Sequence, residues 1–257
     1  YRGDKGWGYN WSAALNGHSQ YFRPGLTWSR RTTSGLSIRA MPLGCIFADK
    51  GPAIFCDSDD QYELLAVLAL TNSRPYEYLV ELQLAAADAA ARSYEVGIIE
   101  NTPIPVLSEK SSAFLRDKSI EAWNIKRLYD SFDETSQYFD VPYLYYSKSN
   151  VLDLESLNSQ YVTIQNEIDN HCFELYGFSD VDRQHASECS SIDELGKRTE
   201  KNDNYSLLNW AVGVLFGRFS YGGEKSTESK DIHFSPFSSF PSVRQVTLDK
   251  KSVKAKG

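Results

Sequence analysis

Apolar side chains recur at helical spacing through the middle of the chain, from about residue 108 to residue 186. The intervals are 7, 3, 4 and 3 residues along Leu115, Ala122, Ile125, Tyr129 and Phe132. A second run keeps intervals of 3 and 4 residues along Leu154, Leu157, Tyr161, Ile164, Ile168, His171 and Leu175, and Gly177 marks its end. Each run places its apolar side chains on one face of a helix. The pattern predicts two long helices packed on each other, with His171 as a hydrogen-bonded core residue.

Short strand patterns are found in the first part of the chain. Residues 37–41 and 44–48 are predicted strands, separated by the turn signal at residues 42–44. Residues 94–99 also follow an extended pattern, and the two prolines in residues 101–105 end it.

Three further helices are predicted outside the middle of the chain. Residues 61–70 are rich in Leu and Ala, and this helix breaks at residues 72–75. A second helix is expected from residue 76 to about 91, and an apolar third one over residues 207–216. The acidic run Asp57-Ser58-Asp59-Asp60 resembles a nuclease metal site only loosely. We interpret it as an acidic loop that caps the helix beginning near Gln61.

Together these patterns predict an α+β protein of three regions. Residues 1–107 form a mixed α/β domain, residues 108–186 a long helical pair, and residues 187–257 a small helical carboxy-terminal region. The last residues, about 250–256, are rich in Lys and are expected to be mobile.

Charge is unevenly distributed along the 257 residues, whose net charge is −7. The first fifty residues contain seven basic and two acidic side chains, a local charge of 7 − 2 = +5. The remainder therefore sums to −7 − 5 = −12. This asymmetry is typical of a protein with one basic working face, although a charge run is often only solvated surface. The composition is that of a globular, cytoplasmic protein, and no apolar run approaches the roughly 20 residues of a membrane helix.

Candidate catalytic and metal-binding groups are scattered. The four cysteines and four histidines form neither a C-x-x-C nor an H-x-x-x-H spacing, so we expect free thiols and no metal. The sequence contains no G-x-S-x-G elbow, no G-x-x-x-x-G-K-[ST] phosphate loop and no G-x-G-x-x-G fingerprint. An independent nuclease is therefore the weakest of the functions considered.

The stretch from residue 21 to residue 35 best fits contact with DNA. It combines arginines, hydroxyls and aromatic rings on a segment punctuated by Pro and Gly. Guanidinium groups can bind phosphates or guanine edges, hydroxyls can bind phosphates, and aromatic rings can stack on an exposed base. The candidate DNA-binding residues are Arg23, Trp28, Arg30, Arg31, Thr32 and Arg39. The alternative is that Tyr21, Phe22, Leu26 and Trp28 are core residues and the arginines only decorate the surface.

A family resemblance rests on several short stretches in order along the chain. They are FRPGLTWS at residues 22–29, SIR at 37–39, GPAIF at 51–55, ALTNS at 69–73, EID at 167–169, ELYG at 174–177 and AVGVLFGRF at 211–219. Together they resemble the recognition region of large adenine-specific DNA methyltransferases, including the methylase of BREX phage-defence systems. The segment NTPIP at 101–105 is similar to the one that closes a recognition domain in type I specificity subunits.

The resemblance implies a division of labour within a larger enzyme. In that family an upstream domain binds S-adenosylmethionine and carries an Asn-Pro-Pro-Tyr motif, where the flipped adenine stacks on the Tyr. This sequence has no such motif. The chain would then hold no cofactor and no catalytic residue, and would select double-stranded DNA for a restriction-modification or phage-defence methylase. The sequence begins at Tyr1 with neither an initiating Met nor a signal-peptide pattern. We therefore expect the methyltransferase domain upstream. The principal alternative is an interaction module that docks the methylase or a nuclease to other defence components through its heptad face.

Overall fold

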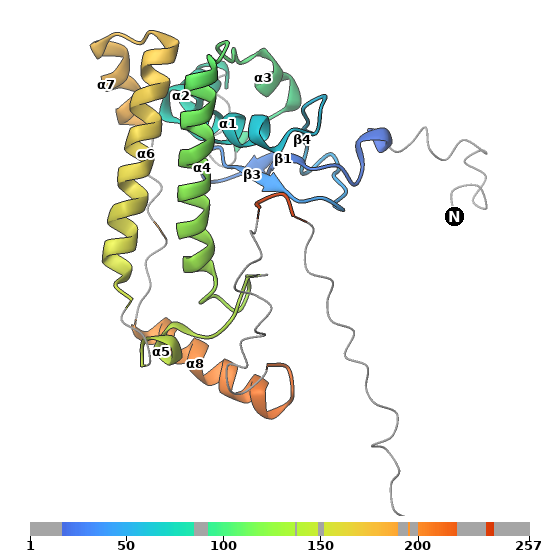
Figure 1. Ribbon diagram of the computed structural model, residues 1–257, viewed down its shortest axis with the longest axis vertical. Helices are drawn as coiled ribbons and strands as arrows, with labels where there is room; N and C mark the ends of the chain where they lie inside the picture. The colour runs from blue at the N-terminus through green and yellow to red at the C-terminus, as the bar shows by residue number, and fades with distance from the viewer. Residues whose placement is uncertain are drawn as a thin grey trace, which may run out of the picture.

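The protein combines a small antiparallel sheet with a set of helices, which is the predicted α+β class (Figure 1). The computed structural model describes residues 17–84, 92–136, 138–148, 152–189, 195, 200–219 and 235–238. The described chain begins with a short 3-10 helix, η2 (His18–Gln20). None of its helices is long and apolar enough to cross a membrane.

The sheet is built around β1 (Gly25–Trp28), which pairs with β3 (Ile38–Met41) on one side and β4 (Ala53–Ile54) on the other. Side chains alternate between the two faces, as strand geometry requires. Leu26, Trp28 and Ile38 are buried against the helices. Thr27 and Arg39 lie opposite each other in the register, on the outer face. A separate two-stranded ladder joins β2 (Arg31–Thr32) to β5 (Arg92–Ser93).

The strand predicted at residues 37–41 is confirmed, but the one predicted at residues 44–48 is wrong. That segment contributes only an isolated bridge between Ala48 and Gly51. β1 is paired on both sides, by β3 and β4, and residues 44–48 add no strand to the outer side of either. Gly44 has φ +91°, a conformation that glycine adopts without strain, and the chain turns away there.

The first two helices follow the sequence closely. α1 (Gln61–Thr71) begins after Asp60, whose carboxylate accepts a hydrogen bond from the Tyr62 amide at 2.8 Å, so the acidic run does cap this helix. α2 (Arg74–Gln83) begins with Pro75 in its first turn, where a missing amide hydrogen costs nothing. The part of this helix predicted over residues 85–91 lies outside the described residues.

The extended segment predicted at residues 94–99 is wrong, because a short helix, α3 (Val96–Asn101), occupies most of it. Ile99 is buried in the core. Thr102 ends the helix, and its hydroxyl donates to the Ile98 carbonyl at 2.8 Å before Pro103 prevents continuation. A run of six residues is too short for its apolar spacing to distinguish a helix from a strand.

The two long helices are present as predicted, except that Phe132, the last residue of the first predicted stripe, lies beyond the end of its helix. α4 (Glu109–Asp130) lies between α1 and α6 (Leu154–Tyr176), and α4 and α6 run antiparallel (Figure 1). Leu115 of α4 and Ile168 of α6 belong to the same core as Leu26 of the sheet. Gly177 ends α6 with φ +69°. The core is therefore continuous across residue 107, where the first region boundary is predicted.

The prediction of a hydrogen-bonded core histidine at position 171 is wrong. His171 is half-buried and packs on Phe114, with 4.6 Å between the ring centroids. Its Nε2 atom has no hydrogen-bond partner within the described ranges. The imidazole lies at the margin of the α4–α6 contact, where an apolar ring is its neighbour.

The carboxy-terminal part adds α7 (Asp180–Cys189) beside α2, and α8 (Glu200–Leu215) against the short α5 (Tyr143–Ser147). The helix predicted over residues 207–216 is confirmed, and it begins earlier than expected. Residues 235–238 return to the sheet region, where the Leu43 amide donates to the Phe237 carbonyl at 3.0 Å and the Phe237 ring is buried.

Candidate nucleic-acid interface

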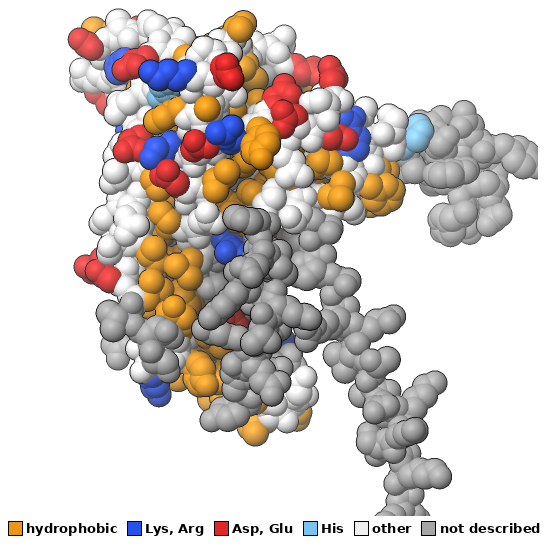
Figure 2. Space-filling view, viewed as in Figure 1, with side chains coloured by type: hydrophobic (Ala, Val, Ile, Leu, Met, Phe, Trp, Pro, Cys, Tyr) orange, Lys and Arg blue, Asp and Glu red, His pale blue; other side chains and the backbone are white. Residues whose placement is uncertain are grey.

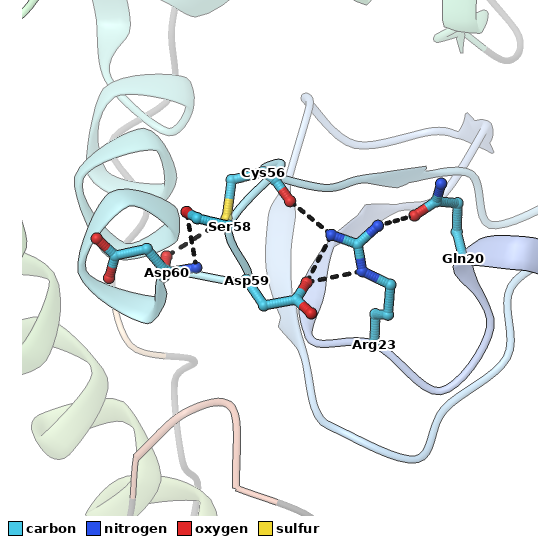
Figure 3. Close-up of polar contacts among 6 residues, drawn as sticks. All are labelled: Gln20, Arg23, Cys56, Ser58, Asp59 and Asp60. Atoms are coloured by element: carbon cyan, nitrogen blue, oxygen red, sulfur yellow. Dashed lines mark hydrogen bonds and ion pairs between the residues drawn. The ribbon is translucent and has the colours of Figure 1, made fainter.

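The guanidinium group of Arg23 makes all of its observed contacts within the protein. Its guanidinium donates to the Asp59 carboxylate and to the Cys56 carbonyl, both at 2.7 Å, and to Gln20 (Figure 3). The hydrogen bond to Asp59 raises the pKa of Arg23 further above its usual range. The guanidinium also lies 5.6 Å from the centroid of the Phe55 ring. Arg23 therefore joins the segment before β1 to the loop before α1, and its charge is neutralised there.

Arg30 is neutralised in the same way by two carboxylates. It forms an ion pair with Glu95 at 2.7 Å and another with Asp49. The hydrogen bond from Arg30 to Glu95 is the main cause that raises the pKa of the arginine. The Arg30 carbonyl also accepts a hydrogen bond from the Tyr94 amide at 2.7 Å. Arg30 therefore links the start of β2 to the segment before α3, and its charge is largely neutralised by the two carboxylates.

Arg31 and Arg39 are different, because both are exposed and neither has an ion-pair or side-chain hydrogen-bond partner among the described residues. Arg39 projects from the outer face of the sheet, opposite Thr27. Arg31 lies in β2, opposite Ser93 of the two-stranded ladder. The six candidate residues thus include two open cations held by strand backbone.

The remaining two candidates serve the fold. Trp28 is buried, and its Nε1 donates to the Tyr94 carbonyl at 2.9 Å, so its ring offers no face to an exposed base. The hydroxyl of Thr32 accepts from the Ser34 amide at 3.0 Å and shapes the turn after β2. The alternative interpretation is therefore right for Leu26 and Trp28. It is wrong for Phe22, which is 62% exposed.

Several residues in the stretches that carry the family resemblance turn out to join elements of the scaffold. The Asn72 side chain accepts from the Ile38 amide at 3.0 Å and donates to the Ile38 carbonyl at 2.9 Å. The Tyr176 hydroxyl donates to the Pro103 carbonyl at 2.9 Å, which ties the end of α6 to the segment after α3. Residue type alone did not predict these roles, because each contact spans elements distant in the sequence.

Asp169 makes the most deeply buried of these contacts between elements. Its carboxylate accepts from the Arg74 amide at 2.9 Å and from the Gln165 side chain at 3.0 Å, and it pairs with the Arg74 guanidinium at 3.3 Å. Only 2% of the side chain is exposed. Burial raises the pKa of Asp169, and the contacts with Arg74 and Gln165 oppose that shift only in part. The contact fixes the start of α2 to the middle of α6.

Among the described residues, no three His, Cys, Asp or Glu side chains gather in a group that could hold a metal ion. The sheet consists of short antiparallel strands, whereas nucleotide-type cofactors bind at the carboxyl ends of parallel strands next to helix starts. The arrangement can present cations to an anionic partner.

The chain resembles a known protein over most of its length. No protein-family model matches the chain. The chain is similar to an adenine-specific methyltransferase. That relative is BrxX of Escherichia coli O9:H4 (strain HS), with 28% identity over 236 residues. The match covers 82% of this chain and 18% of BrxX, so the chain spans less than a fifth of the length of that relative.

Proposed function

We propose that this chain is the sequence-specific DNA-recognition portion of an S-adenosylmethionine-dependent adenine-N6 methyltransferase in a restriction-modification or phage-defence system. The observation that carries the proposal is the pair of open arginines, Arg31 and Arg39, on a strand scaffold in a methyltransferase-related chain. Guanidinium groups bind phosphates and can bind a guanine edge through two hydrogen bonds. Their partner is double-stranded DNA.

The scaffold favours this role because it limits the freedom of both arginines. Arg39 lies in a strand paired over four residues with β1, and β3 is also held by the two Asn72 hydrogen bonds. Arg31 adjoins Arg30, whose two ion pairs fix the chain at that point. A binding group held by packed backbone loses less conformational freedom when it meets its partner.

The number of open cations sets the expected strength of the electrostatic contribution. Two phosphate contacts give a log-log salt slope of roughly −2, so affinity should fall about tenfold between 50 and 200 mM salt. The acidic remainder of the chain adds no attraction. Tight binding therefore requires further contacts from the rest of the enzyme.

Replacing Arg31 and Arg39 together with Ala should abolish most of the duplex binding of this chain and flatten its salt dependence. Each lost phosphate contact lowers the slope by about 0.9, and a lost guanine contact costs a further 1–3 kcal/mol of discrimination, approximately. A fluorescence anisotropy titration at two salt concentrations measures both quantities. The Arg31→Lys, Arg39→Lys variant keeps the charges, so it should keep the slope and lose only the discrimination.

A matched control removes two exposed cations from another surface. Lys110→Ala with Lys126→Ala on α4 changes the net charge by the same amount and should leave binding unchanged. Equal loss in both double variants would mean that only net charge matters, and binding by the Arg31 and Arg39 variant at the original affinity would remove the sheet face from the interface.

This chain is not expected to methylate DNA by itself, because it lacks the Asn-Pro-Pro-Tyr motif. The upstream methyltransferase domain of the same protein supplies S-adenosylmethionine binding and transfer. Incubation of the 257-residue chain with labelled S-adenosylmethionine and mixed duplex DNA should give no incorporation above background. Incorporation that requires this chain would contradict the proposed division of labour.

The alternative of an interaction module that acts through the heptad face has less support. Leu157, Ile164 and Ile168 of that face are buried within the chain itself. A partner could reach them only after α6 had separated from its neighbours.

A further inference from the structure

α8 presents apolar side chains on two opposite sides. One side packs inward, where Trp210 is buried with its ring 4.8 Å from that of Tyr145 in α5. The other side carries exposed residues at helical intervals of 4, 3 and 1. We call this second side the outer stripe of α8, and it consists of Leu208, Val212, Leu215 and Phe216.

The exposure of the outer stripe is large. Leu208 is 60% exposed, Leu215 is 84% exposed and Phe216, directly after the helix, is 86% exposed. At 100° per residue the stripe covers about a quarter of the helix circumference, nearly opposite Trp210. Figure 2 shows hydrophobic side chains at the lower end of the molecule, where Figure 1 places α8. The inner side already supplies the contact with α5, so that contact does not require the outer stripe.

The stripe lacks the positive charge that DNA binding requires. No Lys, Arg, Asp or Glu occurs between Tyr205 and Phe216, so this side of α8 offers no cation to phosphates. A contiguous apolar stripe without charge is typical of the centre of a protein interface. A helix that presents anchors at these intervals fits an apolar groove on a folded protein.

We propose that the outer stripe of α8 is the surface on which the methyltransferase part of the protein docks, an inference that rests on the proposed function. The match to BrxX leaves more than four fifths of that adenine-specific methyltransferase outside the matched region, which is ample protein to cover the stripe. The docking surface and the open arginines lie on different elements, α8 on one side and the strands β2 and β3 on the other. The chain thus contacts catalytic domain and DNA through separate surfaces.

Site-specific photo-cross-linking tests the docking in cells that express the protein from its own gene. A benzophenone amino acid in place of Phe216 should cross-link to methyltransferase residues outside these 257, identified by mass spectrometry. The same probe in place of Val181, an apolar position on α7 that is 62% exposed, should give no such product. Leu208→Ser together with Leu215→Ser should lower the Phe216 cross-link yield about tenfold, the loss expected from removing interface anchors.

The two proposals fail separately in this experiment. Cross-links confined to these 257 residues, to a second copy, to lipid or to another polypeptide would overturn the docking surface, as would the absence of any cross-link. The Leu208→Ser, Leu215→Ser variant should keep its melting temperature, because both side chains are exposed, and should keep its DNA affinity. Loss of binding on Arg31 and Arg39 substitution, with no methyltransferase cross-link, would uphold DNA recognition and reject the docking surface.

Discussion

Replacing Ile164 with Asp lowers the free energy of unfolding by about 3–5 kcal/mol, because the new carboxylate is buried without a partner. Ile164 is buried on α6 and belongs to the core that the long helices share with the sheet. Protonation of the carboxylate would relieve only part of the cost, since the lost apolar contacts are not restored. Urea unfolding followed by circular dichroism gives the difference directly.

Thr163→Asp is the matched control, because Thr163 is the neighbouring residue on the same helix and is exposed. It introduces the same charge next to the same position and should change the stability by less than about 1 kcal/mol. If both variants unfolded at the wild-type urea concentration, the α6 stripe would be exposed in solution, and the interaction-module alternative would regain its surface.

Replacing Asp169 with Ala is expected to cost about 2–4 kcal/mol, because three contacts are lost at one buried point. The Arg74 amide at the start of α2 loses its acceptor, and the Arg74 guanidinium loses its carboxylate. Part of the Arg74 side chain reaches solvent, which keeps the expected cost below that of a fully buried pair. Gln165→Ala is the control, since it removes only one of the three contacts to Asp169, together with the hydrogen bond from Gln165 to the Asn72 carbonyl at 3.1 Å, and it should cost about 1–2 kcal/mol.

The same site predicts the sign of a pH effect. Burial raises the pKa of Asp169, so the folded protein holds the carboxyl proton to a higher pH than the unfolded chain. This contribution to stability is complete below the unfolded pKa, about 4, and is lost as the pH rises through the folded pKa. The Asp169→Asn variant cannot ionise there, so its stability relative to wild type should improve from pH 4 to pH 7. A relative stability that fell over this range would mean that the pKa is lowered.

Helix positions could be predicted from the sequence wherever the apolar spacing persisted over several turns. The apolar spacing along α6 starts at Leu154 and stops before Gly177, and the helix has the same bounds. In the structure the Asp153 carboxylate caps its start and accepts a hydrogen bond from the Glu155 amide at 3.0 Å. Short segments could not be predicted in the same way. α3 has a single buried residue, Ile99, and its conformation depends on the core that receives that side chain.

The composition of the sequence could locate the candidate interface, but it could not show which of its arginines are neutralised by carboxylates. The carboxylate that neutralises Arg23 lies 36 positions away in the sequence, and Asp49 lies 19 positions from Arg30. Only the folded chain brings these charges together, so the local charge of +5 overstates what a ligand would meet. Arg31 and Arg39 are the same residue type as Arg23 and Arg30, and they differ only in having no ion-pair partner among the described residues.

The amide of Asn72 has a consequence for how the sheet can grow. β3 is an edge strand, and edge strands invite another chain to add a strand through their unpaired backbone groups. At Ile38 both of these groups are already bonded to the Asn72 side chain, so an incoming strand would have to displace two hydrogen bonds before forming its own. The start of this edge is therefore protected from strand addition. A large neighbouring domain can lie beside the sheet without adding a strand to it.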